Sequence, residues 1–241
     1  MIPDERRKEI LELLDEKGYV SVKDLSQRLY VSLPTIRRDL TLLEREGYVL
    51  RTHGGASLSI SDSFVEPFAL RKKTNLEAKK YIGKIAASLI HNNDTLFITS
   101  SSTCLEFASH IKPDLRLNIL TNGMPLDHKL SENNNVTVEC PSGIYNYFHE
   151  GIYGKEVKEL ISKRYAQYCF TSCNGIDLVN GLTFSTDLDI TLIRACRKNC
   201  NKLVVLADHT KFGMTYYFKT LSIKEIDIII TDQEPEEKWI T

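Results

Sequence analysis

The sequence predicts two domains: a small winged helix-turn-helix domain, then an α/β domain with a largely parallel sheet and helices on both faces. Three short helical patterns and a hairpin pattern occupy the first part of the chain. After them, strongly apolar strand-like segments alternate with helical ones, which is typical of a buried parallel sheet. The chain of 241 residues is long enough for both, and we expect the domains at 1–57 and 69–241, joined by a linker at 58–68.

The first two helices are marked by apolar spacing and by residues that begin and end helices. Residues 4–16 carry an apolar stripe, and Gly18 follows as a stop signal. Ser21 then precedes a short helical segment with Asp24 three residues on, which indicates an N-terminal cap. A brief turn at residues 30–31 leads to the next helix.

The third helix has an apolar face and a basic face. Ser32 is placed to cap it, and Pro34 is tolerated in a first turn. At about 100° per residue, the apolar side chains form one stripe: Ile36, Leu40 and Leu43. Roughly opposite lie the polar side chains: Arg38, Thr41 and Arg45, with Arg37 beside them. Such a helix can pack on a core with one face and meet a partner with the other.

A hairpin pattern follows this helix. Gly47 ends the helix, residues 48–51 indicate a strand, His53-Gly54-Gly55 a tight turn, and residues 56–58 the returning strand. Three short helices and a basic hairpin together predict a winged helix-turn-helix, because caps, stripe and hairpin all agree.

This arrangement predicts binding to a double-stranded DNA operator. Arginine offers guanine two hydrogen bonds at once in the major groove, so we expect Arg37 and Arg38 to read bases. Hydroxyl groups near the helix are expected to contact phosphates: Ser32, Thr35 and Thr41. Arg51 and His53 on the hairpin would touch the DNA backbone or the minor groove. The alternative is that exposed arginines are simply solvated.

Six apolar segments predict the strands of the second domain: 95–99, 116–121, 136–140, 167–172, 202–207 and 226–231. Helical patterns precede or separate them: 75–90, 104–110, 125–132, 156–163 and 190–200. The first strand runs into Thr99-Ser100-Ser101-Ser102-Thr103, where hydroxyls and backbone N–H groups meet a helix N-terminus, and this favours an anion site. Lys211 is a candidate countercharge. The alternative is that the serines only cap the helix.

The segment VSLPTIRRDLTLLEREGYVLRTHGGA closely resembles the N-terminal signature of the DeoR family of bacterial regulators of sugar metabolism. The rest of the chain is similar to that family's effector domain. The resemblance implies a fold like that of ribose-5-phosphate isomerase, and a repressor of sugar or carbohydrate genes controlled by a phosphorylated sugar or related metabolite. With the anion loop, it assigns effector binding to strand-end residues: Ser100, Ser101, Ser102, Thr103, Thr121, Asn122, Asp208 and Lys211.

The chain departs from the family pattern in these strand-end loops. Thr99 stands where the family has an acid, and serines stand where it has loop glycines: Ser101, Ser142 and Ser172. A serine side chain fills space that glycine leaves open to a ligand and adds a hydroxyl. We therefore expect a narrower or differently polar pocket than the family norm.

Composition restricts other functions. The net charge is −1, so DNA binding depends on a local basic face. No apolar run reaches about 18 residues, and the N-terminus is charged, which predicts a cytoplasmic protein without membrane span or secretory signal. Paired half-sites on DNA and the family resemblance favour a homodimer or homotetramer.

Two alternatives stay open. A sugar-phosphate isomerase with an appended DNA-binding head needs a carboxylate base beside the phosphate loop, where this chain has Thr99. A redox or metal-responsive regulator would use the pairs Cys169/Cys173 and Cys196/Cys200, whose spacing on a helix would place each pair on one face but is not that of zinc sites. We expect no catalytic residues, no metal and no cofactor.

Overall fold

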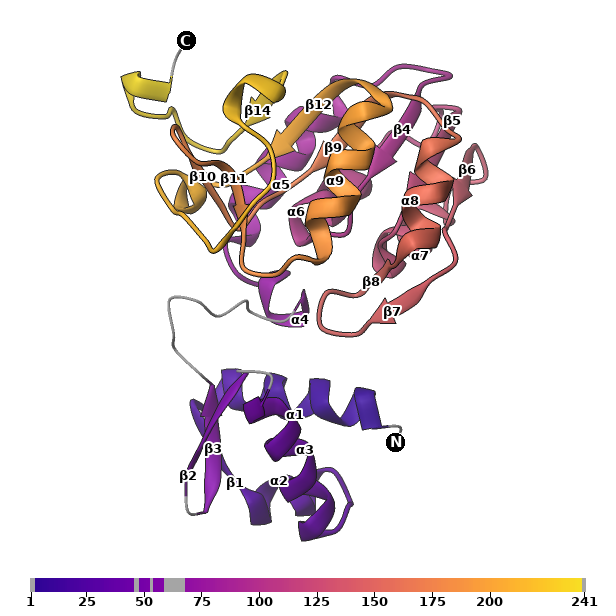
Figure 1. The fold of residues 1–241 in the computed structure, drawn as a ribbon. Helices are drawn as coiled ribbons and strands as arrows, with labels where there is room; N and C mark the ends of the chain where they lie inside the picture. Colours follow the sequence, from indigo (N-terminus) through magenta and orange to yellow (C-terminus); the bar gives the residue numbers. More distant parts are fainter. Residues whose placement is uncertain (1–2, 46–47, 53, 59–67, 240–241) are drawn as a thin grey trace. The chain divides into compact units, whose positions relative to one another are not determined.

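The computed structural model describes residues 3–45, 48–52, 54–58 and 68–239 (Figure 1). The chain forms two compact units, Met1–Lys73 and Thr74–Thr241. Within the described ranges, no helix is both long and apolar enough to cross a membrane.

The first unit is a winged helix-turn-helix, as expected. Its helices are α1 (Pro3–Lys17), α2 (Val22–Arg28) and α3 (Leu33–Arg45), and its strands are β1 (Tyr19–Ser21), β2 (Val49–Thr52) and β3 (Gly55–Leu58). The wing is the β2–β3 hairpin, and β1 pairs with β3 to give an antiparallel sheet of order β1-β3-β2. The sequence analysis missed β1, because three residues are too few to show a strand's alternation.

The core and caps of this unit confirm the sequence patterns. The largest buried side chains come from all three helices: Ile10, Leu14, Leu25, Ile36, Leu40 and Leu43. The Ser21 Oγ accepts a hydrogen bond from the Asp24 N–H at 3.0 Å, which is the predicted cap of α2.

The expected linker is described only at its ends. Leu58 ends β3, Phe68 begins the short helix α4 (Phe68–Arg71), and residues 59–67 lie outside the described residues. The two units divide between Lys73 and Thr74, so α4 belongs to the first unit. The sequence analysis had placed residues from 69 onward in the second domain.

The second unit contains a six-stranded sheet in which every neighbouring pair is parallel. Its order is β14-β12-β9-β4-β5-β6. The strands are β4 (Thr95–Ile98), β5 (Leu117–Thr121), β6 (Val136–Glu139), β9 (Ala166–Thr171), β12 (Cys200–Leu206) and β14 (Ile228–Ile230). All six predicted strands are therefore present. Because they are parallel, their carboxyl ends share one edge of the sheet, where ligands bind in open α/β folds.

Helices cover both faces of this sheet, which confirms the predicted architecture (Figure 1). One core cluster joins the sheet to α5 (Leu76–Ala87), α6 (Ser102–Ser109) and α7 (Met124–Leu130). A second cluster on the other face joins it to α8 (Lys155–Ser162) and α9 (Leu188–Lys198).

The second unit also has two small antiparallel sheets that the sequence analysis missed. One is the hairpin of β7 (Ile144–Asn146) and β8 (Gly151–Tyr153), and the other has the order β10-β11-β13. The latter contains β10 (Gly175–Asp177), β11 (Gly181–Phe184) and β13 (Phe218–Lys219). Short 3₁₀ turns complete the unit: η1 (His209–Lys211), η2 (Ile223–Glu225) and η3 (Glu237–Trp239).

Gly83 sets the close approach of α5 to α6. A Cβ at this position would lie 2.7 Å from the Phe107 nitrogen and 2.9 Å from the Glu106 oxygen, both backbone atoms. We expect Gly83→Ala to destabilise the second unit by about 1–3 kcal/mol in urea unfolding, although alanine favours helices. The exposed neighbour Lys84 is the matched control, and Lys84→Ala should change stability by less than about 0.5 kcal/mol. Equal stabilities of the two variants would contradict this packing.

Candidate nucleic-acid interface and ligand site

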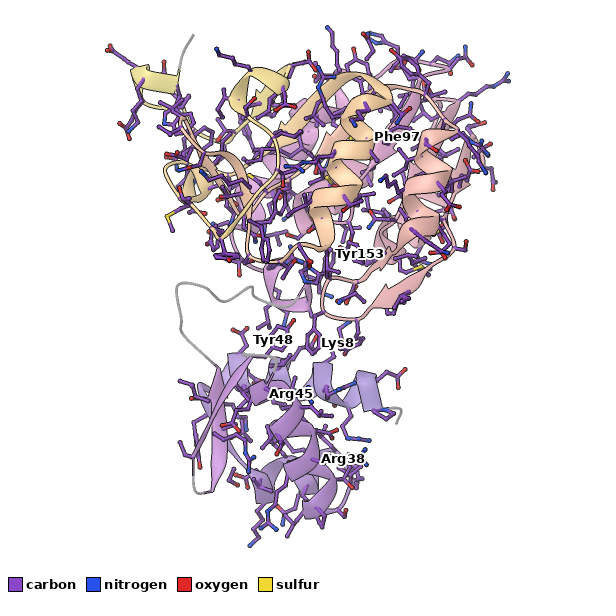
Figure 2. The ribbon with its side chains drawn as sticks, in the orientation of Figure 1. Lys8, Arg38, Arg45, Tyr48, Phe97 and Tyr153 are labelled. Carbon is purple, nitrogen blue, oxygen red and sulfur yellow. The ribbon has the colours of Figure 1, made fainter. Side chains whose placement is uncertain are left out.

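The α3 helix presents its basic face to solvent. Ile36, Leu40 and Leu43 are fully buried, while Arg37 and Arg38 are exposed. Figure 2 shows the Arg38 side chain on α3. The exposed arginines are available to a groove of DNA without any rearrangement of the core. Their predicted role in reading bases is compatible with this geometry.

A buried ion pair fixes α3 against α1. The Arg6 Nε donates to Asp39 Oδ2 at 2.5 Å, the Arg6 Nη2 donates to Asp39 Oδ1 at 3.1 Å, and both side chains are buried. The hydrogen bond to Asp39 raises the pKa of Arg6, so the Arg6 guanidinium stays charged. The sequence analysis missed this pair. Its signal was Asp39 itself, an acid on the apolar stripe three residues after Ile36.

The hydroxyls at the start of α3 bind each other. The Ser32 Oγ and Thr35 Oγ1 lie 2.8 Å apart, and the Thr35 N–H donates to Ser32 Oγ at 3.4 Å. Ser32 is exposed and Thr35 is half-buried. They cap the helix in this state, and their contact with phosphates stays a prediction.

The wing is tied to α3 through two residues that the sequence analysis assigned to DNA. The Arg51 Nη1 donates to Thr41 Oγ1 at 2.7 Å, and the Thr41 hydroxyl donates to the Arg37 carbonyl at 2.8 Å. Arg51 also lies 3.6 Å from a Glu44 carboxylate oxygen. Thr41 and Arg51 therefore hold the wing in register with α3. The remaining wing residue of the prediction, His53, lies outside the described residues.

The predicted anion loop is the turn from β4 into α6. Ser101 is extended, with φ −156° and ψ 156°, and its Oγ accepts from the Cys104 N–H at 3.0 Å. This conformation does not require glycine. The Ser101 hydroxyl occupies the Cys104 N–H, a donor that a glycine at position 101 would leave to a ligand. The narrower pocket expected from the substitution stays a prediction.

Two residues of this loop keep their donors unpaired. Ser102 and Thr103 are only 5% and 4% exposed, yet their hydroxyls have no hydrogen-bond partner among the described residues. As the first residues of α6, they also have N–H groups without a partner inside the helix. Free donors at a helix N-terminus are the chemistry that binds an anionic group.

Other predicted effector residues hold the loop in place. The Ser100 N–H donates to Asn122 Oδ1 and its hydroxyl donates to the His149 carbonyl, both at 2.9 Å. The Asn122 Nδ2 donates to the Ile152 carbonyl at 3.2 Å. Thr121 is fully buried, and its Oγ1 accepts from the Gly123 N–H at 3.1 Å. These contacts fasten the loop to the β5–α7 turn and to the β7–β8 hairpin.

Two uncharged threonine side chains lie beside the loop. The Thr99 and Thr171 Oγ1 atoms lie 2.8 Å apart, and both residues are buried. Thr99 takes the place where the family pattern has an acid. This pair of hydroxyls carries no charge, whereas a carboxylate at the same position would repel an anion.

Asp208 and Lys211 lie at the same edge of the sheet, after β12. Strand β9 lies between them and the predicted anion loop at residues 99–103, called the serine loop below. Asp208 is buried and caps η1 by accepting from the Thr210 N–H at 3.0 Å. Lys211 is half-buried. Cys173 follows β9, and its thiol pKa is raised mainly by burial; the Lys211 charge lowers that pKa and the Asp208 charge raises it. Ser172 is half-buried beside Cys173, whereas Ser142 is exposed just before β7.

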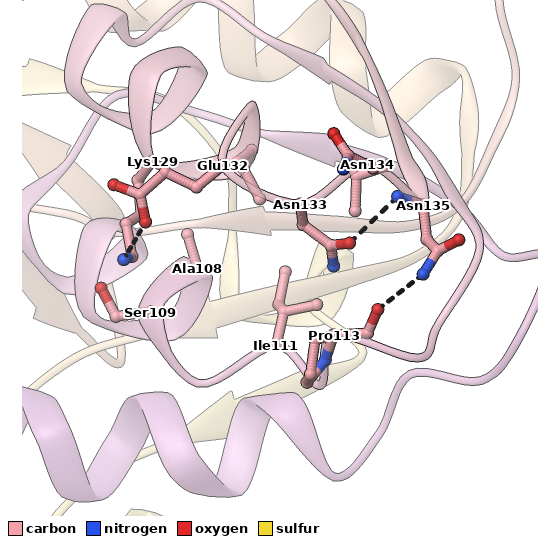
Figure 3. Close-up of a pocket in the computed structure, with 11 residues that line it drawn as sticks. Ala108, Ser109, Ile111, Pro113, Lys129, Glu132, Asn133, Asn134 and Asn135 are labelled. Carbon is pink, nitrogen blue, oxygen red and sulfur yellow. Dashed lines mark hydrogen bonds and ion pairs between the residues drawn. The ribbon is translucent and has the colours of Figure 1, made fainter.

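A groove of about 400 Å³ lies at the opposite edge of the sheet, between the ends of α6 and α7 and the start of β6 (Figure 3). Two of its polar side chains are engaged: Lys129 Nζ donates to Glu132 Oε2 at 2.5 Å, and Asn135 Nδ2 donates to the backbone carbonyl of Pro113 at 2.8 Å.

The cysteine pairs do not lie as the four-residue spacing suggested. Cys196 is in α9 and Cys200 begins β12, so they do not share a helix face. Burial raises the pKa of the Cys104 and Cys173 thiols to about 12, which keeps them protonated and unreactive at neutral pH. Among the described residues, no group of three His, Cys, Asp or Glu side chains is arranged to hold a metal.

Comparisons with known proteins cover both units. Residues 6–61 match the DeoR-like helix-turn-helix domain, and residues 74–233 match the DeoR C terminal sensor domain. The chain is 37% identical over 237 residues to the HTH-type transcriptional regulator GolR of Listeria innocua, covering 97% of this chain and 92% of the relative. It is 30% identical over 239 residues to the HTH-type transcriptional repressor GlcR of Bacillus subtilis, covering 99% and 92%.

One solved structure shares the fold at low sequence identity. The eIF2B delta structure from Chaetomium thermophilum has a TM-score of 0.50 and 19% identity over 69% of this chain and 59% of that chain. Ribose 5 phosphate isomerase A from Neisseria gonorrhoeae scores 0.42 at 11% identity, over 57% and 53%, which is too low to support an argument.

The two curated relatives are named as transcriptional regulators, and this decides against the isomerase alternative. The family matches span both units of the fold, and they agree with the signature in α3 and the wing. The chain belongs to the DeoR family of transcriptional regulators, with a DeoR-like helix-turn-helix domain followed by a DeoR C-terminal sensor domain.

Proposed function

We propose that this regulator represses genes of sugar or carbohydrate metabolism and is controlled by a phosphorylated sugar or related metabolite. It reads a DNA operator through Arg37 and Arg38 of α3. The effector's phosphate binds at the start of α6, and the rest of the metabolite lies along the strand-end loops toward Asp208 and Lys211. A homodimer or homotetramer in the cytoplasm presents paired α3 helices to paired half-sites.

The observation that carries the effector assignment is the set of unpaired donors on Ser102 and Thr103. A phosphate group has several strong acceptor oxygens and a negative charge, and both suit a helix N-terminus. The Thr99–Thr171 hydroxyl pair beside the loop carries no negative charge that would repel a phosphate. The repressor role is supported by the similarity to GlcR, an HTH-type transcriptional repressor.

Control of DNA binding requires the ligand to favour one conformation of the protein over another. The serine loop is bonded to the β5–α7 turn and to the β7–β8 hairpin, so a ligand that moves the loop also moves these segments. A metabolite that binds both conformations equally would leave the operator affinity unchanged.

Thr103→Val tests the phosphate site, because valine keeps the shape of threonine and removes its hydroxyl. We expect the affinity for sugar phosphates, measured by calorimetric titration of a panel, to fall by about 10- to 150-fold, since a hydrogen bond to a charged group contributes about 1.5–3 kcal/mol. Ser109→Ala, at the exposed far end of the same helix, is the control and should bind as wild type does. Wild-type affinity in Thr103→Val would contradict the proposed site.

A further inference from the structure

The turn between α2 and α3 holds a tyrosine in a backbone conformation that suits glycine. Leu29 is the C-cap of α2, Tyr30 follows with φ +53°, and the Val31 N–H donates to the Ser26 carbonyl at 3.2 Å. This is a Schellman cap, in which the residue after the helix end takes the left-handed conformation and is usually glycine. The Ser26 hydroxyl also donates to the Val31 carbonyl at 2.6 Å, so the turn is fixed.

The Tyr30 side chain makes no buried contact that would offset this strain. It is 93% exposed, the largest exposure among the large apolar and aromatic residues described. A left-handed conformation is unfavourable for a residue with a Cβ. An exposed ring buries no apolar surface that would offset the cost. Strain of this kind is typical of residues whose side chain serves binding.

The position of Tyr30 indicates its partner. It lies two residues before Ser32, the cap of α3, and the exposed strip continues from it through Ser32 and Pro34 to Arg37 and Arg38. In helix-turn-helix proteins the first turns of the recognition helix enter the major groove. The residues just before that helix therefore lie beside the phosphates that border the groove.

We infer that Tyr30 is a DNA contact, in which the phenol hydroxyl donates a hydrogen bond to a backbone phosphate oxygen next to the α3 groove. Tyrosine is among the side chains that bind phosphates in this way. The contact adds affinity for DNA of any base sequence and sets how deeply α3 enters the major groove. It is neutral, so it displaces no counterion and leaves the salt dependence to the arginines. The inference rests on the DNA-reading role proposed for α3.

The test uses the full chain with two duplexes: an operator selected by the wild-type protein from a random-sequence library, and a mixed-sequence duplex of equal length. We expect Tyr30→Phe to weaken binding to both by about fivefold per bound head, the loss of one hydrogen bond. The slope of log affinity against log salt should stay at the wild-type value. Tyr30→Gly should weaken binding at least as much, with a thermal unfolding midpoint equal to or above that of wild type.

Tyr217 is the matched control, because it is 88% exposed and lies in the second unit. Tyr217→Phe should bind both duplexes as wild type does. Wild-type DNA affinity in both Tyr30 variants would overturn the assignment of Tyr30 alone, leaving the proposed role of α3 intact. A wild-type protein that selects no duplex from the library would overturn both.

Discussion

Replacing Asp39 with alanine is expected to destabilise the winged helix-turn-helix unit by about 3–5 kcal/mol. The substitution leaves the Arg6 guanidinium buried between α1 and α3 without its partner, and an unpaired buried charge costs that much. Because whole domains are stable by only about 5–15 kcal/mol, a large share of the stability of this unit would be lost. Chemical unfolding of the full chain, followed by circular dichroism, should show an early transition that is absent from the wild type.

Two further variants separate the charge from the packing. The double variant Arg6→Met with Asp39→Leu replaces the ion pair by apolar side chains and should recover most of the lost stability. Glu44→Gln removes a partly exposed partner of Arg51 and should change stability by less than about 1 kcal/mol. An Asp39→Ala protein as stable as the wild type would show that the Arg6–Asp39 pair does not hold α3.

Alanine in place of Arg37 or Arg38 is expected to remove most of the operator selectivity. Each arginine that binds a base with two hydrogen bonds contributes about 1–3 kcal/mol of discrimination, so the affinity for the selected operator should fall by roughly 5- to 150-fold. Affinity for a mixed-sequence duplex should fall less, because only the loss of charge applies there. Equilibrium binding to both duplexes measures the ratio directly.

Arg116 provides the matched control for these arginines. It is exposed and lies in the second unit, so Arg116→Ala removes the same charge without touching α3. This variant should keep the wild-type ratio of specific to mixed-sequence affinity. If Arg37→Ala and Arg38→Ala kept that ratio too, α3 would not be the helix that reads bases.

The sequence was sufficient to predict the architecture because its patterns are local. The predicted strand at 202–207 contains a continuous apolar run from Leu203 to Ala207, which a parallel strand buried on both faces requires. The caps at Ser21 and Ser32 depend on neighbours three residues away. Strand order was not predictable in this way, because neighbouring strands such as β4 and β9 are far apart in the sequence. The small sheets were not predicted because β1, β7 and β10 are only three residues long.

The candidate sites were predictable in part. Sequence reasoning placed hydroxyls at the end of β4, but which of them stay free depends on long-range contacts. The Ser100 hydroxyl donates a hydrogen bond to the carbonyl of His149, which belongs to the β7–β8 hairpin and lies 49 positions further along the chain. Arg6 is likewise 33 positions from Asp39. Tyr30 gave no signal in the sequence, because its conformation and exposure appear only in the folded turn.

The most direct measurement of the central claim is operator binding by the full chain with and without each of a panel of sugar phosphates. We predict that at least one phosphorylated compound changes the operator affinity by about fivefold or more, the usual lower range of allosteric coupling. In that experiment Thr103→Val should bind the operator normally and lose the response. An operator affinity that no phosphorylated compound changes, in a protein that binds its operator tightly, would contradict control through the start of α6.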